Sequence, residues 1–219
     1  MDRPDPRTTY DRIADHFAKT RAYPWPEVES FVADAERAAL ALDVGCGNGR
    51  HAEVLATRAD RVVALDASRG LLGTARERSV ESGFDADLVQ GDAGALPVRD
   101  ERVGLAVYVA TLHHLRSRDR RIASLDELAR VLEPGGRALV GVWSTIHDRF
   151  DAETGFDTTV DWTLPDGETV PRYYHIYDPA EFDRDLAASA LAVHETFRSS
   201  GNCYAVVDAR RSGRRSAQT

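Results

Sequence analysis

A glycine-rich loop near residue 45 is the first feature of the sequence that could bind a small molecule. The segment "LDVGCGNG" places Gly45, Gly47 and Gly49 between an expected strand and an expected helix. Glycines let the backbone approach a ligand closely, and the first N–H groups of a helix favour an anionic ligand group. A dinucleotide fingerprint would need a further glycine at position 50, where this chain has Arg50. The loop by itself therefore does not identify the ligand.

Two aspartates follow the loop at spacings that extend such a site. Asp66 ends the second expected strand, where a carboxylate can accept hydrogen bonds from both hydroxyls of a ribose. Asp92 lies in "GDA", which follows the third strand and ends at Ala93, and it could accept a hydrogen bond from an adenine amino group. Ligands of open α/β sheets bind at the carboxyl ends of the strands. The loop and the two acids together predict one nucleoside site.

Histidine and arginine cluster after the fourth expected strand. The segment "TLHHLRSRDRR" (111–121) holds His113, His114 and four arginines. It could be a solvated loop, a metal site, or an active-site mouth that faces an anionic substrate. Two adjacent side chains cannot readily chelate one ion, and the two cysteines of the chain form no CxxC pair, so no metal site is expected.

The elements that must position these residues alternate between strand and helix. Short apolar runs predict strands at 38–47, 61–66, 87–92, 103–110 and 137–143, with closing strands at 193–200 and 203–210. Helical patterns lie at 49–58, 68–82, 118–136 and 178–190. This alternation predicts an α/β fold with a mostly parallel sheet covered by helices on both faces. Residues 144–178 are polar, aromatic and too long for a simple connection, so we expect a functional insertion.

Length and composition bound the class of protein. The chain has 219 residues, of which 42% are hydrophobic, and this suits one domain. No apolar run approaches the roughly 20 residues of a membrane span, and the start lacks the apolar core of a signal peptide, so we expect a cytoplasmic protein. The net charge of −8 argues against nucleic acid as a partner, although clustered arginines can still form a local basic face.

The three motifs together resemble the class I S-adenosylmethionine-dependent methyltransferases over residues 38–143. "DVGCGNG" is similar to their first motif, Asp66 to their ribose-binding acid, and "GDA" to their adenine-side motif. The resemblance implies S-adenosylmethionine as cofactor and a Rossmann-like, seven-stranded, mostly parallel sheet whose last strand is antiparallel. It also implies that Asp43 contacts the methionine part of the cofactor.

Two flanking segments could contact the acceptor. "TRAYPWP" (20–26) is a rigid aromatic segment in which Arg21 and Trp25 could hold an anion and stack a base, or simply cover the fold. "RYYHIY" (172–177) alternates, so Tyr173 and His175 would share one strand face and Arg172 would lie on the other. Packing alone could use the tyrosines, but it does not readily account for Arg172 and His175.

With "HHLRSRDRR", these flanks resemble one narrower family, the tRNA carboxymethyluridine methyltransferases that act at wobble position 34. The C-terminal "GNCYAVV" is also similar to that family's ending. The chain departs from the pattern at Tyr23, Leu115 and Cys203, which puts substrate detail in doubt more than reaction class. The resemblance implies a tRNA anticodon arm as substrate and a small zinc-bearing activator protein as partner.

On this hypothesis the chain divides into a substrate lid (1–37), a cofactor core (38–143), a substrate-side insertion (144–178) and a C-terminal helix with strands (179–210). The carboxylate of 5-carboxymethyluridine is already ionised near neutral pH, so its methylation needs positioning rather than a strong base. We assign that positioning to a guanidinium or an imidazole.

The residues assigned to catalysis are His113, Arg21 and Arg172. Tyr173, His175 and Trp25 are expected to bind the substrate, and Arg118 and Arg121 are expected to contact phosphates of the anticodon arm, unless they merely solvate a helix start. Two alternatives stay open: a methyltransferase of a small metabolite, and a non-catalytic subunit that binds S-adenosylmethionine or RNA.

Overall fold

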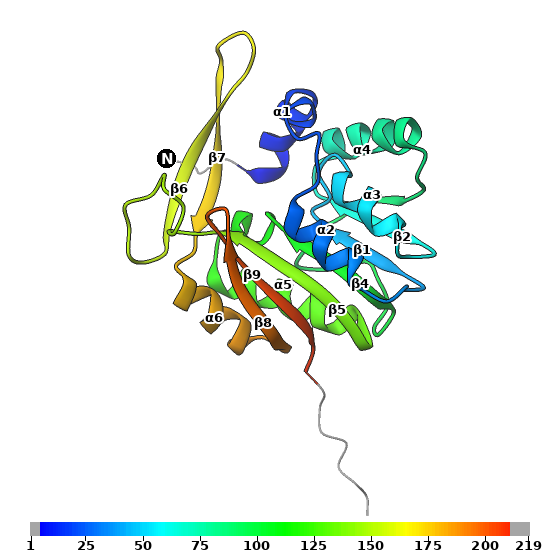
Figure 1. The fold of residues 1–219 in the computed structure, drawn as a ribbon. Helices are drawn as coiled ribbons and strands as arrows, with labels where there is room; N and C mark the ends of the chain where they lie inside the picture. Colours follow the sequence, from blue (N-terminus) through cyan, green and yellow to red (C-terminus); the bar gives the residue numbers. More distant parts are fainter. Residues whose placement is uncertain (1–4, 211–219) are drawn as a thin grey trace, which may run out of the picture.

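The computed structural model describes residues 5–210, and its centre is a seven-stranded sheet in the order β3-β2-β1-β4-β5-β9-β8 (Figure 1). Most of the C-terminal arginine cluster at 209–215 lies outside the described residues. The strands of the sheet are β1 (Ala41–Val44), β2 (Val62–Asp66), β3 (Asp87–Gln90), β4 (Val103–Val109), β5 (Leu132–Trp143), β8 (Leu191–Ser199) and β9 (Asn202–Ala209). The first five pair in parallel, and β9 runs antiparallel between β5 and β8. The predicted α/β fold with a Rossmann-like sheet is confirmed.

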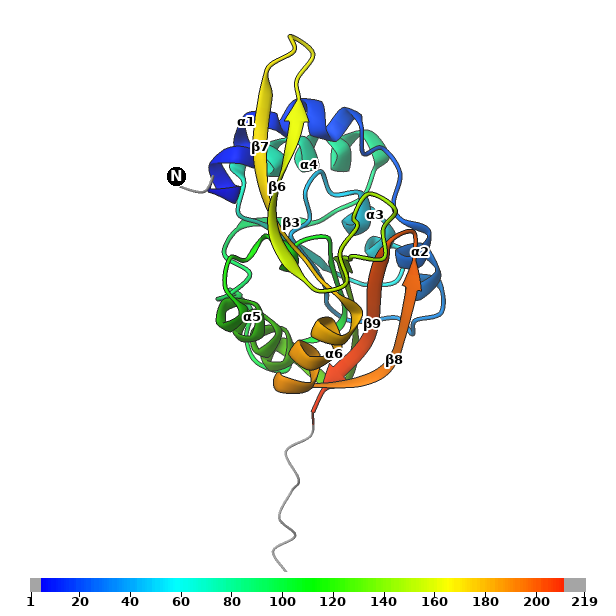
Figure 2. The same cartoon turned by 90° about the vertical axis from the view of Figure 1, so that its left-hand side faces the viewer.

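Helices cover both faces of this sheet (Figures 1 and 2). They are α1 (Pro6–Lys19), α2 (Pro26–Ala33), α3 (Arg50–Ala56), α4 (Arg69–Ser82), α5 (Arg118–Val131) and α6 (Pro179–Ala188), with a short 3₁₀ turn, η1, at Leu112–His114. Side-chain caps begin several of them, because an N-cap oxygen accepts a hydrogen bond from a free N–H of the first turn. Ser68 caps α4, Ser117 caps α5, and Asp178 caps α6 ahead of a proline.

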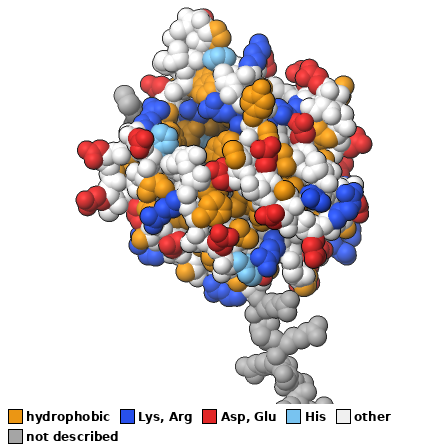
Figure 3. All heavy atoms as spheres, in the orientation of Figure 1, with side chains coloured by type: hydrophobic (Ala, Val, Ile, Leu, Met, Phe, Trp, Pro, Cys, Tyr) orange, Lys and Arg blue, Asp and Glu red, His pale blue; other side chains and the backbone are white. Residues whose placement is uncertain are grey.

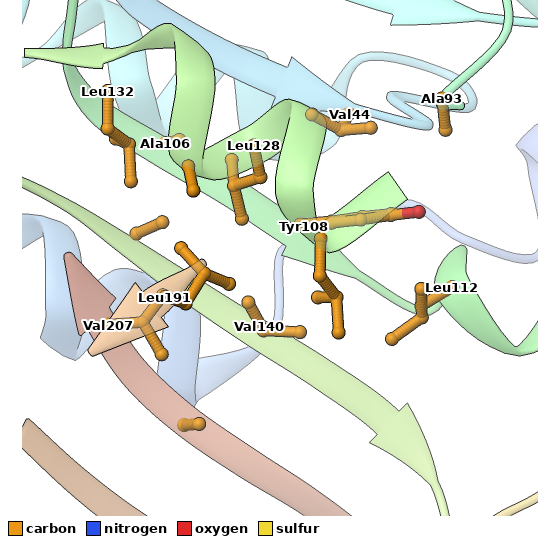
Figure 4. Close-up of a cluster of buried hydrophobic side chains, with 14 of the residues drawn as sticks. Val44, Ala93, Ala106, Tyr108, Leu112, Leu128, Leu132, Val140, Leu191 and Val207 are labelled. Carbon is orange, nitrogen blue, oxygen red and sulfur yellow. The ribbon is translucent and has the colours of Figure 1, made fainter. Parts of the chain in front are cut away.

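The central strands are buried on both faces, as expected for a covered parallel sheet. All four residues of β1 and all five of β2 are buried. On one face, β4 and β5 pack against α5, with Tyr108, Leu128 and Val140 among the fully enclosed side chains (Figure 4). This core fixes the carboxyl ends of the strands, where the predicted motifs lie.

A two-stranded hairpin stands apart from the main sheet above those strand ends (Figures 1 and 2). It consists of β6 (Phe156–Thr163) and β7 (Thr169–Ile176), which pair antiparallel within the segment expected to be an insertion. Its buried Trp162 packs with Ile13 of α1 in a small cluster of its own. The hairpin and α1 therefore form two walls of a space over the edge of the sheet.

The boundary predicted between the helix at 118–136 and the strand at 137–143 was wrong. The helix expected at 118–136 ends at Val131, because "LEPGG" already belongs to the long strand β5. Proline disfavours helix in the residue before it, and this helix ends three residues before Pro134. Within residues 5–210, no helix combines the length and the apolar character needed to cross a bilayer. The cytoplasmic location stays a prediction.

Candidate functional site

The first of two neighbouring cavities opens at the carboxyl ends of β1, β2 and β3, and we name it the glycine-loop cavity. Its volume is about 730 Å³. Its wall includes residues of α1, the glycine loop and the segments after β2, β3 and β4: Tyr10, Phe17, Gly45, Gly47, Asp66, Ser68, Gln90, Gly91, Asp92, Ala93, Thr111, His114, Leu115, Arg116 and Arg120. The loop, the two aspartates and Ala93 predicted from sequence therefore come together.

Only glycine fits at the start of this wall. A Cβ on Gly45, which has a φ of +75°, would lie 2.0 Å from Oγ1 of Thr111. The end of β1 therefore lies directly against the segment that follows β4. Gly49 lies deeper and packs on Ala75, so of the three predicted glycines it alone does not line the cavity.

Asp66 is fixed by the backbone of the same wall. Its carboxylate accepts hydrogen bonds from the N–H of Gly47, at 2.9 Å, and of Ser68, at 2.8 Å. Burial raises the pKa of Asp66 to about 6 despite these two bonds. Each carboxylate oxygen retains a free lone pair, so the group can still accept hydrogen bonds from a ligand.

The two other aspartates predicted to contact the cofactor, Asp43 and Asp92, are placed differently from Asp66. Asp43 is 1% exposed and lines neither cavity, and one of its carboxylate oxygens is buried without a hydrogen-bond partner. Burial, with the charge of Asp66 as a second cause, raises the pKa of Asp43 to about 7. Asp92 does line the glycine-loop cavity, but one of its oxygens already accepts a hydrogen bond from Arg120 at 2.7 Å.

The second cavity, of about 490 Å³, lies between the β6–β7 hairpin and the ends of β4, β5 and β9, and we name it the arginine cavity. Figure 3 shows this face hollowed below the hairpin, with basic side chains around hydrophobic ones. Four arginines line it: Arg21, Arg50, Arg149 and Arg172. Aromatic and polar side chains complete the wall, among them Trp25, Glu27, His113, Trp143, Tyr174, Asn202 and Tyr204.

The two cavities share a wall made of Tyr10, Phe17, Ala110 and His114. Ala110 follows β4 with a φ of +60°, an uncommon conformation for a residue with a Cβ. The strained turn redirects the chain from the sheet into η1, which carries His113 and His114. A group held in one cavity therefore lies next to a group held in the other.

Arg172 is a buried cation without a carboxylate partner. It is 7% exposed, and no Asp or Glu among residues 5–210 lies within ion-pair distance of it. Its guanidinium lies over the ring of Trp162, at 4.8 Å, and donates a hydrogen bond to the hydroxyl of Tyr174, at 2.7 Å, while its Nε is buried and unpartnered. A buried charge is normally paired, so this one favours an anionic ligand.

Both histidines of η1 are neutral near pH 7. Burial, assisted by the charge of Arg172, lowers the pKa of His114 to about 4 and that of His113 well below its usual value. Nδ1 of His113 accepts a hydrogen bond from the backbone N–H of Trp143 at 3.1 Å, which leaves the proton on Nε2. His113 therefore offers one neutral N–H donor.

His114 ends a chain of hydrogen bonds that starts at Arg172. Its Nδ1 lies 2.9 Å from the carbonyl oxygen of Tyr173, so it donates there, and its Nε2 accepts from the hydroxyl of Tyr10. The Tyr10 oxygen in turn lies 3.3 Å from the hydroxyl of Tyr174. These contacts fix α1 and β7 to the turn after β4.

The two substrate-binding residues predicted on β7 face away from the arginine cavity. His175 is 7% exposed and lies between carboxylates of Asp157 and Glu181, each 2.9 Å from a ring nitrogen. Tyr173 is 2% exposed and donates a hydrogen bond to Asp157 at 2.8 Å. The alternation was predicted correctly, but the two substrate-binding residues were chosen from the wrong face, because Tyr174 lines the cavity beside Arg172.

The arginines predicted to contact RNA phosphates also need correction. Arg121 is 3% exposed and lies beneath Tyr177, with its guanidinium 3.2 Å from Glu181 and 3.7 Å from Asp185. Arg118 is half exposed, but its Nε lies 2.7 Å from the buried Asp185. Arg121 therefore belongs to the packing between α5 and α6, and Arg118 already has a counter-charge.

Comparison with known proteins agrees with this arrangement. Residues 42–140 match a family described as a methyltransferase domain. The chain is 39% identical over 136 residues to a tRNA (carboxymethyluridine(34)-5-O)-methyltransferase of Xenopus tropicalis, a match that covers 62% of this chain and 20% of that protein. It is 28% identical over 216 residues to the enzyme of the same name from Schizosaccharomyces pombe, covering 84% and 88%. The chain thus spans about a fifth of the length of the first of these relatives.

Solved structures show the same fold. The CcbJ methyltransferase from Streptomyces caelestis aligns with a TM-score of 0.77 at 22% identity, over 95% of this chain and all of that one. A DhpI–SAH complex aligns with a TM-score of 0.70 at 22% identity, over 94% and 95%. Residues 42–140 therefore form a methyltransferase domain, and the chain has the class I fold. The resemblance seen in its sequence is confirmed.

Several residues of this methyltransferase were missed by sequence. Tyr10, Phe17 and Trp162 have the spacing of ordinary packing residues, and only the fold brings them to the cavities. Arg50 follows the glycine loop directly, so its position was the available signal. Among residues 5–210, no group of three or more histidine, cysteine or acidic side chains is placed to hold a metal ion.

Proposed function

We propose that this methyltransferase transfers a methyl group from S-adenosylmethionine to the carboxylate of 5-carboxymethyluridine at the wobble position of tRNA. The observation that carries the proposal is Arg172, a buried cation that lines a cavity next to the glycine-loop cavity and has no carboxylate of its own among the described residues. The names of the relatives point to the same acceptor.

The glycine-loop cavity fits the cofactor. Gly45 and Gly47 expose backbone, Asp66 can accept hydrogen bonds from ribose hydroxyls, and Ala93 and Asp92 lie where the adenine would be held. S-adenosylmethionine, when bound, supplies a methyl group on a sulfonium centre that an oxygen nucleophile can displace. Arg120 must release one oxygen of Asp92 if that oxygen is to accept from the adenine amino group.

The chain's own residues then have to hold and orient an anion. Arg172 would pair with the acceptor carboxylate, and Arg21 lies over the same Trp162 ring, 5.4 Å from its centroid. His113 would donate from Nε2 to one carboxylate oxygen, and Trp25 would contact the base. The other oxygen forms the new bond to the methyl carbon as the sulfur–carbon bond breaks. No proton moves, so positioning and exclusion of water supply the catalysis.

The partners follow from the same proposal. The anticodon arm would approach the open side of the arginine cavity, and a zinc-bearing activator would complete the enzyme in the cytoplasm. Arg121, Tyr173 and His175 stabilise the fold behind the cavity rather than contact substrate.

The test is methylation of defined tRNA, with and without a zinc-bearing activator. With tRNA that carries 5-carboxymethyluridine and labelled S-adenosylmethionine, we expect a nucleoside whose label is released by mild alkali, as for a methyl ester. The matched control is the same tRNA with the carbamoylmethyl amide, which offers no anion to Arg172 and should not react. An alkali-stable product, or transfer only to a small carboxylic acid, would contradict the proposed acceptor.

A further inference from the structure

The arginine cavity holds more positive charge than one carboxylate can neutralise. Four guanidinium groups line it, and the only acidic side chain in its described wall is Glu27. None of the four arginines has an aspartate or glutamate within ion-pair distance among residues 5–210. The acceptor carboxylate would balance one charge, which leaves guanidinium groups that could bind a second anion.

Arg50 marks where that second anion would lie. Its guanidinium lies over the ring of Trp25, 5.4 Å from the centroid, and donates one hydrogen bond to the carbonyl oxygen of Tyr23 at 3.2 Å. Its remaining N–H groups have no hydrogen-bond partner among the described residues. Burial, and next the charge of Arg21, lowers the pKa of Arg50 to about 10.

The two ends of the cavity are linked by Arg21. The guanidinium of Arg21 lies over the same Trp162 ring as that of Arg172. It is also close enough to Arg50 for its charge to lower the pKa of Arg50. A molecule that occupies both ends therefore needs two anionic groups joined by a short uncharged body. Beside Arg50, Tyr204 lines the same cavity, with Glu27 and Asn202 close to its hydroxyl.

We propose that Arg50, with Arg21 beside it, forms a phosphate subsite. It would bind a phosphate of the acceptor nucleotide while Arg172 binds the base carboxylate. The inference rests on the proposed function for the identity of the acceptor, but the subsite itself is a statement about phosphate binding. Planar guanidinium groups suit phosphate oxygens, and aromatic stacking holds Arg50 in place for them.

The experiment compares ligands that differ only by a phosphate. The probes are 5-carboxymethyluridine and its 3′- and 5′-monophosphates, titrated by calorimetry into the chain saturated with S-adenosylhomocysteine. One monophosphate should bind roughly ten- to a hundredfold more tightly than the nucleoside, because two or more hydrogen bonds to a charged group are gained. In Arg50→Gln that preference should fall to threefold or less.

Two further variants separate charge from packing. Arg50→Lys keeps the charge and should retain most of the phosphate preference, whereas an equal loss in both variants would make Arg50 a packing residue and overturn the subsite. Arg118→Gln, an arginine already paired with Asp185, is the matched control and should leave the preference unchanged.

The remaining outcomes are also decisive. If Arg50→Gln weakens S-adenosylhomocysteine binding as much as monophosphate binding, Arg50 serves the carboxylate of the cofactor and the subsite is wrong. A wild-type chain that binds nucleoside and monophosphates equally would overturn it as well. If no tRNA is methylated, uridine and its monophosphates replace the probes, so failure of the proposed function leaves the phosphate preference measurable.

Discussion

The arginines of this chain fall into two groups that differ in one respect, the presence of a counter-charge. In the segment 116–121, Arg118 and Arg121 meet Asp185, and Arg120 meets Asp92. In the arginine cavity, Arg172 and its three neighbours face no carboxylate within ion-pair distance among residues 5–210. From sequence we placed members of both groups in the substrate site, Arg118 and Arg121 as well as Arg21 and Arg172, yet only the second group lacks a counter-charge.

The difference teaches that local density of charge is a poor guide to function. A buried arginine paired within the fold costs little and contributes specificity of packing, while one left without an anion weakens the fold unless a ligand completes it. Evolution tolerates such a cost mainly at functional sites. Each prediction below tests this contrast on a chosen residue.

The largest expected effect is on the stability of the fold when a paired arginine is replaced. Arg121→Met should lower the free energy of unfolding by about 3–5 kcal/mol, because it leaves the buried carboxylate of Asp185 with less compensation. Urea unfolding measures the loss, and Arg118→Met is the matched control with a smaller effect. If the variant has near-normal stability and a flatter salt dependence of tRNA binding, Arg121 contacts RNA phosphates instead of stabilising the fold. That result would contradict the division into paired and unpaired arginines.

The unpaired group should show the opposite pattern. Arg172→Met should lower kcat/KM for the carboxymethyluridine tRNA about a hundredfold or more, since the anion loses its buried partner. Stability should be unchanged or higher, because an unpartnered charge has been removed from the interior. Unfolding curves and S-adenosylhomocysteine binding, which should stay within about threefold, complete the measurement. A large loss of stability would mean that Arg172 holds the fold rather than the substrate.

The sequence predicted the features that depend on local patterns and missed those that depend on contacts between distant segments. The sheet, the glycine loop and Asp66 were predictable because each depends on local patterns: apolar runs, glycine spacing and strand ends. The face of β7 was not, because Tyr173 and Tyr174 are chemically identical, and only the fold decides that Tyr173 meets Asp157 and Tyr174 meets Arg172. Likewise nothing local distinguishes Arg121 from Arg172, since the acids that pair with Arg121 lie 60 or more residues further along the chain.

The smallest expected effect is on cofactor affinity and concerns Asp66. Like Arg172, Asp66 is a buried ionisable group that faces a cavity, but its carboxylate already accepts hydrogen bonds from the backbone. Burial raises its pKa to about 6 in the free chain, while ribose hydroxyls would donate to its ionised form. Affinity for S-adenosylhomocysteine should therefore rise by about tenfold from pH 5 to pH 7, as the ionised fraction does, and then level off. Calorimetry at several pH values measures this rise, and Asp66→Asn should bind more weakly and with no rise.

Asp43 provides the control that makes the assignment specific. Its pKa is also raised, to about 7, but it lines neither cavity, so Asp43→Asn should keep the rise in affinity between pH 5 and 7. If that variant abolishes the rise instead, the titrating group is Asp43.

The stability of the free chain should change with pH in the opposite sense. Because the folded state holds protons on these carboxyls that the unfolded chain has released above about pH 4, the free energy of unfolding should fall as pH rises through 6. Affinity and stability would then diverge over one pH range, as expected of a group whose ionised form the fold disfavours and the ligand needs.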